Sequence, residues 1–298
     1  MSFGSAPKTV KLEILNPHGF CAGVKAALEK ARRLAMSGER VYCLHEIVHN
    51  EIVVEDLKGR GFVFVEDLRE VPEGATVLFS AHGVSPAVRR EAEAKGLKIE
   101  DATCPFVARV HKAAAGFHDK GLQVVVIGKA SHAEVRGILG EAPDALVVSS
   151  VKEVENLEFP QADVRKIGVV SQTTMNADDV AEIVSALSRR FEIDSVAEVC
   201  NATKERQDAV KAFAGDAVLV LGSANSSNTR RLSEVAGCKT FRAGNIEEVK
   251  ALDLSGVDRL GITSGASTPE SFFQSVLEIF NNSHLSSNSP PFAKVNET

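Results

Sequence analysis

Asn-Pro-His-Gly-Phe-Cys-Ala-Gly, at residues 16–23, is the first of three segments in which a cysteine directly precedes a helix-like pattern. The other two are Asp-Ala-Thr-Cys-Pro at 101–105 and Glu-Val-Cys-Asn-Ala-Thr at 198–203. Each is followed by helical periodicity, a glycine and a short apolar run that is typical of a strand. A polar turn then follows, and its key residue lies 28 positions after each cysteine: His49, His132 and Asn228. The repeat predicts three related α/β modules.

Helices and apolar strands alternate along most of the chain, which is the pattern of βαβ units and parallel sheets. The helices expected after the three cysteines cover Val24–Leu34, Val107–Phe117 and Lys204–Phe213. The glycines expected to cap their C-termini are Gly38, Gly121 and Gly215. The expected strands are 10–15, 41–44, 62–65, 76–79, 124–127, 145–148, 167–170, 218–221 and 259–262, of which the first alternates apolar and charged residues like a half-exposed strand.

Three modules of roughly 90 residues fit the repeat, each with one cysteine and one small, mostly parallel sheet. We place them at residues 9–98, 99–195 and 196–282, and expect 283–298, which is rich in Ser, Asn and Pro, to be a disordered tail. The last strand of each module leads into small polar residues or histidine, at 80–83, 171–174 and 263–267. Ligands of open α/β sheets bind beyond the carboxyl ends of the strands. The predicted fold is therefore three pseudo-threefold-related α/β modules around one central site.

Composition excludes several classes of partner. The chain has 298 residues, 44% of them hydrophobic, and a net charge of −6, which favours neither nucleic acid nor an anionic membrane as partner. No apolar run approaches the length of a membrane span, of about 20 residues, and the N-terminus lacks the regions of a signal peptide. We therefore expect a cytoplasmic protein, and a monomer.

The five cysteines divide into two groups. An odd number of scattered cysteines argues against a disulfide framework. Cys43 and Cys238 lie in apolar or unremarkable surroundings and are interpreted as small hydrophobic residues. The other three, Cys21, Cys104 and Cys200, stand at loop-to-helix junctions, where the helix dipole and free N–H groups favour thiolate. Those three are the candidate metal ligands.

Two kinds of metal site compete for these thiolates. Structural zinc usually takes paired ligands such as C-x₂-C, and this sequence has no such pair. Three single cysteines from distant segments suit an iron–sulfur cubane better, because its thiolates attach to separate irons. A fourth iron without a protein ligand could then act as a Lewis acid toward the substrate.

Histidine and hydroxyl residues at the strand ends indicate anion binding and proton delivery. His49, His82 and His132 occupy comparable turns, and Glu134 follows His132 closely. Ser226-Ser227-Asn228 and Ser267 could be simple turn formers, but before helices they also resemble phosphate cradles. Nucleotide binding is not favoured, because the chain has no Walker lysine motif and no G-x-G-x-x-G after a strand.

Taken together, these segments resemble the 4-hydroxy-3-methylbut-2-enyl diphosphate reductase family. The resemblance runs from about Ile14 to Phe280 and depends on many motifs in one order. The motifs lie at 16–24, 45–50, 80–84, 101–105, 171–174, 222–228 and 265–267.

The resemblance implies three α/β domains around a [4Fe–4S] cluster held by Cys21, Cys104 and Cys200. The residues that correspond to the family's diphosphate-binding set are His49, His82, His132, Ser226, Ser227, Asn228 and Ser267. Glu134 corresponds to the proton-relay acid and Thr173 to the hydroxyl beside the 4-OH of the substrate, and His132 is expected to be catalytic together with them. One departure is His132-Ala133-Glu134 where the family has His-Pro-Glu, with Lys129 at a position often held by histidine, which puts the local loop geometry in question.

The activity that the resemblance implies is reductive dehydroxylation of the allylic diphosphate to isopentenyl and dimethylallyl diphosphate, the last step of the methylerythritol phosphate route to isoprenoids. A small ferredoxin or flavodoxin would supply the electrons. Two alternatives stay open at this point. One is another three-cysteine enzyme resembling quinolinate synthase, which would not require the histidine set beside Ser226-Ser227-Asn228. The other is an iron–sulfur redox sensor, for which the acidic chain lacks a basic DNA-binding patch.

Overall fold

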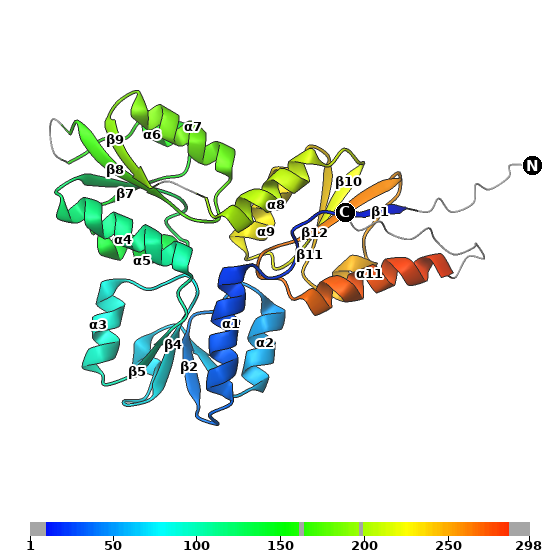
Figure 1. Cartoon of the computed structure of the whole chain (residues 1–298), viewed down its shortest axis with the longest axis horizontal. Helices are drawn as coiled ribbons and strands as arrows, with labels where there is room; N and C mark the ends of the chain where they lie inside the picture. The colour runs from blue at the N-terminus through cyan, green and yellow to red at the C-terminus, as the bar shows by residue number, and fades with distance from the viewer. Residues whose placement is uncertain (1–9, 161–163, 197–198, 286–298) are drawn as a thin grey trace, which may run out of the picture.

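Three lobes of similar construction meet at the middle of the molecule (Figure 1). The structure is a computed structural model, and it describes residues 10–160, 164–196 and 199–285. Each lobe contains one four-stranded sheet, and all the strand pairings in the three sheets are parallel. The predicted fold class, three α/β modules with small parallel sheets, is therefore confirmed.

The first module has the sheet order β3-β2-β4-β5. Its strands are β2 (Val41–Leu44), β3 (Phe62–Val65), β4 (Thr76–Phe79) and β5 (Lys98–Asp101). Its helices are α1 (Ala22–Ala35), α2 (Glu51–Gly59), the 3₁₀ turn η1 (Leu68–Glu70) and α3 (Pro86–Ala94).

The second module has the order β7-β6-β8-β9. Its strands are β6 (Gln123–Ile127), β7 (Leu146–Val148), β8 (Lys166–Ser171) and β9 (Glu192–Val196). Its helices are α4 (Pro105–Asp119), α5 (Ala133–Glu141), α6 (Val151–Glu155) and α7 (Ala177–Ser188).

The third module has the order β11-β10-β12-β1. Its strands are β1 (Lys11–Ile14), β10 (Ala217–Leu221), β11 (Lys239–Ala243) and β12 (Arg259–Ser264). Its helices are α8 (Asn201–Ala212), α9 (Ser227–Glu234), α10 (Ile246–Lys250) and α11 (Glu270–Leu285).

The three sheets share one strand order, with the strand that follows each cysteine-bearing helix in second place. In the third sheet, however, the fourth place is taken by β1, from the other end of the chain, which pairs with β12 from Lys11–Arg259 to Ile14–Ile262. The opening strand therefore belongs to the third module, and its assignment to a module at 9–98 was wrong. Among the described residues the third repeat ends with helix α11 and no strand follows it, and the edge of β12 pairs with β1.

The expected module boundaries also need correction. The edge strand β5 spans the boundary placed between residues 98 and 99, and β9 continues to Val196, beyond the boundary at 195. The boundaries were placed from the cysteine repeat, whereas the strand that completes each sheet lies directly before the cysteine. Helix α11 continues through Leu285, so 283–285 are helical and not part of a tail. The rest of the expected tail lies outside the described residues.

The sequence prediction missed three strands, β5, β9 and β11, and all three lie at sheet edges. Their sequences are Lys-Ile-Glu-Asp, Glu-Ile-Asp-Ser-Val and Lys-Thr-Phe-Arg-Ala. Charged side chains are common on edge strands, where they discourage pairing with other chains, and they hide the apolar run by which a strand is recognised. The predicted central strands are confirmed, because burial on both faces makes them continuously apolar.

Two of the three predicted C-cap glycines are confirmed. Gly38 and Gly121 have φ angles of +72° and +73°, and Leu122 N–H donates to the carbonyl of Phe117 to close α4. Gly215 was expected to do the same for α8, but it lies outside the left-handed region. Glycine is needed here instead because it leaves room for the ring of Phe213, since a Cβ at Gly215 would lie 2.1 Å from that ring.

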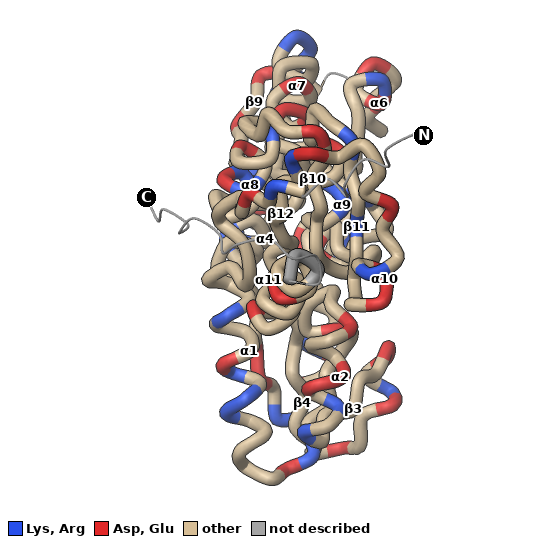
Figure 2. Tube along the Cα trace, turned by 90° about the vertical axis from the view of Figure 1, so that its right-hand side faces the viewer, with Lys and Arg blue, Asp and Glu red and all other residues tan. Residues whose placement is uncertain are grey.

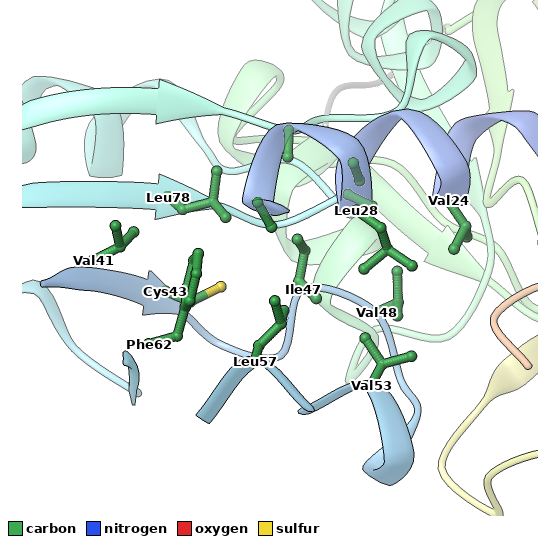
Figure 3. Packing of buried hydrophobic residues seen from close by; sticks show 14 residues of the cluster. Val24, Leu28, Val41, Cys43, Ile47, Val48, Val53, Leu57, Phe62 and Leu78 are labelled. Atoms are coloured by element: carbon green, nitrogen blue, oxygen red, sulfur yellow. The ribbon is translucent and has the colours of Figure 1, made fainter. Parts of the chain in front are cut away.

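The apolar core of the first module lies between α1, α2 and its sheet (Figure 3). Cys43 is fully buried there among Val41, Ile47 and Phe62, and burial raises the pKa of its thiol to about 12. Cys238 packs against the core cluster of the third module that contains Val218. Both positions fit the interpretation of these two cysteines as packing residues.

Charged residues are distributed over helices, loops and edge strands of the modules (Figure 2). Figure 2 shows basic and acidic positions interspersed, without a face of one sign in that view. None of the helices in the described part of the chain combines the length and the apolar character that a membrane span requires.

Candidate functional site at the centre of the three modules

The three modules enclose a central cavity of about 110 Å³. Every residue singled out in the sequence as a candidate ligand, catalytic or substrate-binding residue lines it: Cys21, His49, His82, Cys104, His132, Glu134, Thr173, Cys200, Ser226, Ser227, Asn228 and Ser267. Residues separated by more than 240 positions thus face one space. The repeat had indicated such a common centre.

The sheets place the polar side chains by one simple rule. The two central strands of each module point their carboxyl ends at the cavity, and each delivers part of the polar lining. The lining residues after these strands are His49 (β2), His82 (β4), His132 (β6), Thr173 (β8), Ser226 to Asn228 (β10) and Ser267 (β12). Parallel strands bring these ends to the same edge, so each module contributes two groups.

The three cysteines are N-cap residues of their helices. Cys21 caps α1, and its Sγ accepts a hydrogen bond from Val24 N–H at 3.5 Å. Cys104 caps α4, with proline at the first helical position as predicted, and Cys200 caps α8. Helix N–H groups lower the pKa of both Cys104 and Cys200, but burial outweighs them and raises the pKa of each thiol. The expected lowering of thiol pKa is therefore wrong for these two residues without a bound cation.

The surroundings of the cysteines fit an iron–sulfur cluster. All three candidate ligands are thiols, and the charges of Cys21 and Cys200 both act on Cys104. The start of α1 lies very close to Cys104, because a Cβ added at Gly23 would lie 2.5 Å from the Sγ of Cys104. Within the described residues, no three His, Cys, Asp or Glu side chains are arranged to hold a single metal ion. A cluster needs no such arrangement, because each thiolate attaches to its own iron.

Three imidazole rings form one wall of the cavity. The rings of His49 and His82 stack with centroids 4.3 Å apart, and His132 meets both edge-on at 5.6 and 5.7 Å. The Nδ1 of His132 accepts a hydrogen bond from Glu134 N–H at 3.2 Å, which leaves Nε2 as the donor of the neutral ring. The Nδ1 of His49 lies 3.0 Å from Glu46 Oε2, which orients this ring.

Burial and mutual repulsion keep two of these rings neutral at pH 7. Burial first, and then the charges of His49 and other neighbours, lower the pKa of His132 to about 4. The same causes, burial before the neighbouring histidines, hold the pKa of His82 well below its usual value. A bound anion would reverse this balance, because opposite charge favours the protonated ring.

Glu134 and Thr173 form a buried pair beside the histidines. Thr173 donates from its N–H to Glu134 Oε1 at 2.8 Å and from its hydroxyl to Oε2 at 3.1 Å. Glu134 is 1% exposed, and burial raises the pKa of its carboxyl from 4.5 to about 7, despite the two hydrogen bonds that lower it. A carboxyl with this pKa can hold and release a proton near neutral pH.

Because its pKa is raised in the folded protein, Glu134 should destabilise the protein to an extent that depends on pH. The folded protein keeps the proton between pH 4.5 and about 7, where the unfolded chain releases it, so the free energy of unfolding falls as pH rises through this window. Glu134→Gln removes that cost, roughly 3 kcal/mol at about 1.4 kcal/mol per pKa unit. In urea unfolding of the cluster-free protein, the variant should gain stability over the wild type between pH 5 and 8. If the difference in unfolding free energy between the variant and the wild type did not change with pH, the raised pKa would be contradicted.

The third module provides hydroxyl and amide groups opposite the histidines. Ser226 caps α9 by accepting from Thr229 N–H at 3.3 Å, and Ser267 donates to the carbonyl of His49 at 3.1 Å. Asn228 is 4% exposed, yet neither its Oδ1 nor its Nδ2 has a hydrogen-bond partner. A buried amide without partners is unfavourable, so its position indicates a polar ligand in the cavity.

Sequence reasoning assigned no role to two buried polar residues that support the site. Gln172 donates to Ser227 Oγ at 3.2 Å and to Thr174 Oγ1 at 2.8 Å, which links the second and third modules. Its motif had been noticed, but an amide in a turn has no distinctive signal. Arg206 donates hydrogen bonds to the carbonyls of Ala202 and Gly19, beside Cys200 and Cys21, and in the sequence it looks like any charged residue of an amphipathic helix.

Ala133 occupies the first position of α5, a position that also accepts proline. His132 caps α5 with φ −75° and ψ 139°, and Ala133 begins the helix, as a proline there would. The backbone N–H of Lys129 donates to Gln172 Oε1 at 3.2 Å, so this loop is held to β8 independently of the lysine side chain.

Comparison with known proteins gives a consistent result. The LytB protein family profile matches residues 12–281. A 4-hydroxy-3-methylbut-2-enyl diphosphate reductase of Burkholderia mallei is 45% identical over 282 residues, 91% of this chain and 86% of that protein. The corresponding reductase of Bordetella pertussis is 46% identical over 275 residues, 89% of this chain and 84% of that protein.

Solved structures agree in fold and architecture. The structure of the E-1-hydroxy-2-methyl-but-2-enyl-4-diphosphate reductase from Plasmodium falciparum is 35% identical, with a TM-score of 0.85, over 92% of this chain and 88% of that one. A second, of (E)-4-hydroxy-3-methyl-but-2-enyl diphosphate reductase, described as the terminal enzyme of the non-mevalonate pathway, is 33% identical, with a TM-score of 0.64 over 92% and 99% of the two chains. With the family profile, the relatives and the three-module fold in agreement, this chain belongs to the LytB protein family and is an oxidoreductase.

Proposed function

We propose that the protein converts (E)-4-hydroxy-3-methylbut-2-enyl diphosphate to isopentenyl and dimethylallyl diphosphate at a [4Fe–4S] cluster held by Cys21, Cys104 and Cys200. One observation carries the proposal. An all-thiolate ligand set and an anion-binding set of imidazole, hydroxyl and amide groups line the same small cavity. The names of the similar reductases supply the substrate class.

The reaction consumes two electrons and two protons and releases water. When bound, the cluster supplies low-potential electrons and an iron without a protein ligand, which serves as a Lewis acid. No amino-acid side chain can provide such electrons. The protein provides binding, orientation, water exclusion and protons.

The diphosphate end of the substrate binds between the histidines and the third module. His132 donates through Nε2, because its Nδ1 already accepts from Glu134 N–H. Asn228 has an unused donor and acceptor, and the first turn of α9 directs N–H groups toward the cavity. The negative charge of the ligand draws a proton to His82, whose ring is neutral in the free protein. Substrate binding is therefore coupled to proton uptake.

Glu134 provides the proton for the leaving hydroxyl. Its pKa of about 7 leaves it partly protonated at neutral pH, and Thr173 holds both carboxyl oxygens in place. Thr173 also lines the cavity, which supports a contact between its hydroxyl and the 4-OH of the substrate. A second proton, added to either end of the remaining allyl group, decides between the two products. An external one-electron donor, a small ferredoxin or flavodoxin, completes the reaction, and the cytoplasm is the expected compartment.

Mössbauer spectroscopy of anaerobically prepared, iron-57-enriched protein tests the proposal, with and without the hydroxylated diphosphate. We expect four irons, one of them distinct and shifted by the substrate. Four irons without any response would favour another three-cysteine enzyme. No cluster after reconstitution would overturn the assignment of the three cysteines.

Asn228→Ala is expected to weaken ligand binding and to increase the stability of the free protein. The buried amide has no partner in the free protein, and removing it should raise the free energy of unfolding by about 1 kcal/mol. Binding of inorganic diphosphate should weaken about tenfold, which corresponds to about 1.4 kcal/mol. Asn225→Ala, at an exposed position of the same turn that does not line the cavity, is the control and should change neither property. Calorimetry and urea unfolding measure both, and unchanged diphosphate affinity would remove Asn228 from the binding set.

A further inference from the structure

Arg206 is a buried cation that connects two of the cysteine-bearing segments. Its side chain is 2% exposed within α8. The guanidinium donates from Nη1 to the carbonyl of Ala202 at 2.7 Å and from Nη2 to the carbonyl of Gly19 at 2.8 Å. Ala202 lies two residues after Cys200, and Gly19 lies two residues before Cys21.

The loop that Arg206 contacts is held in a defined conformation. Gly19 has a φ of +69° and donates its N–H to Ser264 Oγ at 2.7 Å. Two residues later, Cys21 N–H donates to the carbonyl of Ala266 at 3.1 Å. The guanidinium therefore joins this fixed loop to the first turn of α8, and it does not itself line the cavity.

No carboxylate within the described residues forms an ion pair with Arg206, and its Nε is buried without a hydrogen-bond partner. Burial lowers the pKa of Arg206, but an arginine stays charged in a protein. The charges that oppose this lowering are first those of the Cys21 and Cys200 thiols. A buried cation without an anionic partner is strongly unfavourable. A cluster bound through the two cysteines would supply the anionic partner that the buried guanidinium lacks.

We infer that Arg206 is a positioning residue of the cluster site, which fixes the Cys21 loop against α8 and offsets the negative charge of the cluster. The inference rests on the proposed function, because it requires a cluster at the three cysteines. A thiolate-bound cluster becomes more negative by one charge on one-electron reduction. A fixed buried cation stabilises that reduced state and raises the reduction potential.

Anaerobic redox titration, followed by electron paramagnetic resonance, tests the inference on the reconstituted full chain without substrate. In Arg206→Gln, the equilibrium constant for one-electron reduction should fall tenfold or more, which equals a shift of about 59 mV to lower potential. Arg206→Lys keeps the positive charge, so its reduction potential should stay near that of the wild type. Lysine cannot reproduce the two guanidinium hydrogen bonds, so the iron content of this variant should fall.

Two control variants separate charge at the site from other effects. Gln207→Leu removes the contacts of the neighbouring residue with Ala177 N–H and the Met175 carbonyl but changes no charge. Lys211→Gln removes a charge from the exposed end of the same helix, where Lys211 pairs with Asp178. Neither should shift the potential.

The outcomes are distinct. Loss of the cluster in Arg206→Gln, with partial retention in Arg206→Lys, would also support the inference, because lysine keeps the positive charge and glutamine does not. Equal shifts in both variants, or wild-type potential and iron content in Arg206→Gln, would overturn it. If the wild type itself binds no cluster, the proposed function fails instead.

Discussion

Replacing Cys104 by serine is expected to abolish cluster binding and, with it, reductase activity. Cys104 caps α4 at the junction of the first two modules, and its backbone N–H donates to the carbonyl of Ala81. Serine can keep this N-cap geometry, so the helix should form, but a hydroxyl is a much poorer iron ligand than a thiolate. Loss of an outer partner alone costs about 10–100-fold in metal affinity, so loss of a ligand should cost roughly 100-fold or more.

Iron and acid-labile sulfide content after anaerobic reconstitution, together with turnover of the allylic diphosphate, measure this effect. Cys43→Ala and Cys238→Ala are the matched controls, because both residues take part in apolar packing and neither lines the cavity. They should keep the full iron content. Normal iron content and activity in Cys104→Ser would contradict the ligand assignment.

Replacing Glu134 by glutamine is expected to lower turnover by about 10²–10⁴-fold while the cluster and the substrate affinity are retained. The amide can accept from Thr173 N–H and donate to the Thr173 hydroxyl, so it resembles the protonated carboxyl in shape and bonding. It cannot release a proton to the leaving hydroxyl. The variant therefore separates proton delivery from positioning.

The pH dependence adds a second readout for Glu134. Proton donation requires the acid form, so wild-type turnover should decline as pH rises through about 7, and the variant should lose this decline. Glu141→Gln is the matched control, because Glu141 lies on the same helix but pairs with His111, away from the cavity. Near-wild-type turnover in Glu134→Gln would remove Glu134 from the proton path.

Much of the fold could be predicted because its central parts obey local rules. Central strands such as β6 and β10 are buried on both faces and therefore appear as continuous apolar runs. The helices behind the cysteines have clear amphipathic periodicity, and Gly121 ends α4 with a positive φ as expected. The edge strands escaped prediction because an edge carries charged residues and little apolar signal.

The site was accessible from sequence for a similar reason. The repeat, with a cysteine before each helix and a polar residue after each strand, can be recognised in the sequence without any knowledge of distances. The strand order then fixes where these residues meet. The residues that support the site, Gln172 and Arg206, carry no such periodic signal, since their roles depend on contacts between modules.

The sequence by itself determined the three modules, the cysteine at each helix start and the polar residues at the strand ends. These features depend on local propensity, on burial of short apolar runs and on the repeat. Only the tertiary structure decided that β1 completes the third sheet, that burial raises the pKa of Glu134 to about 7, and that Arg206 binds the loop before Cys21. Long-range strand pairing, desolvation and the proximity of charges depend on which residues meet in the folded protein, and no local sequence pattern predicts them.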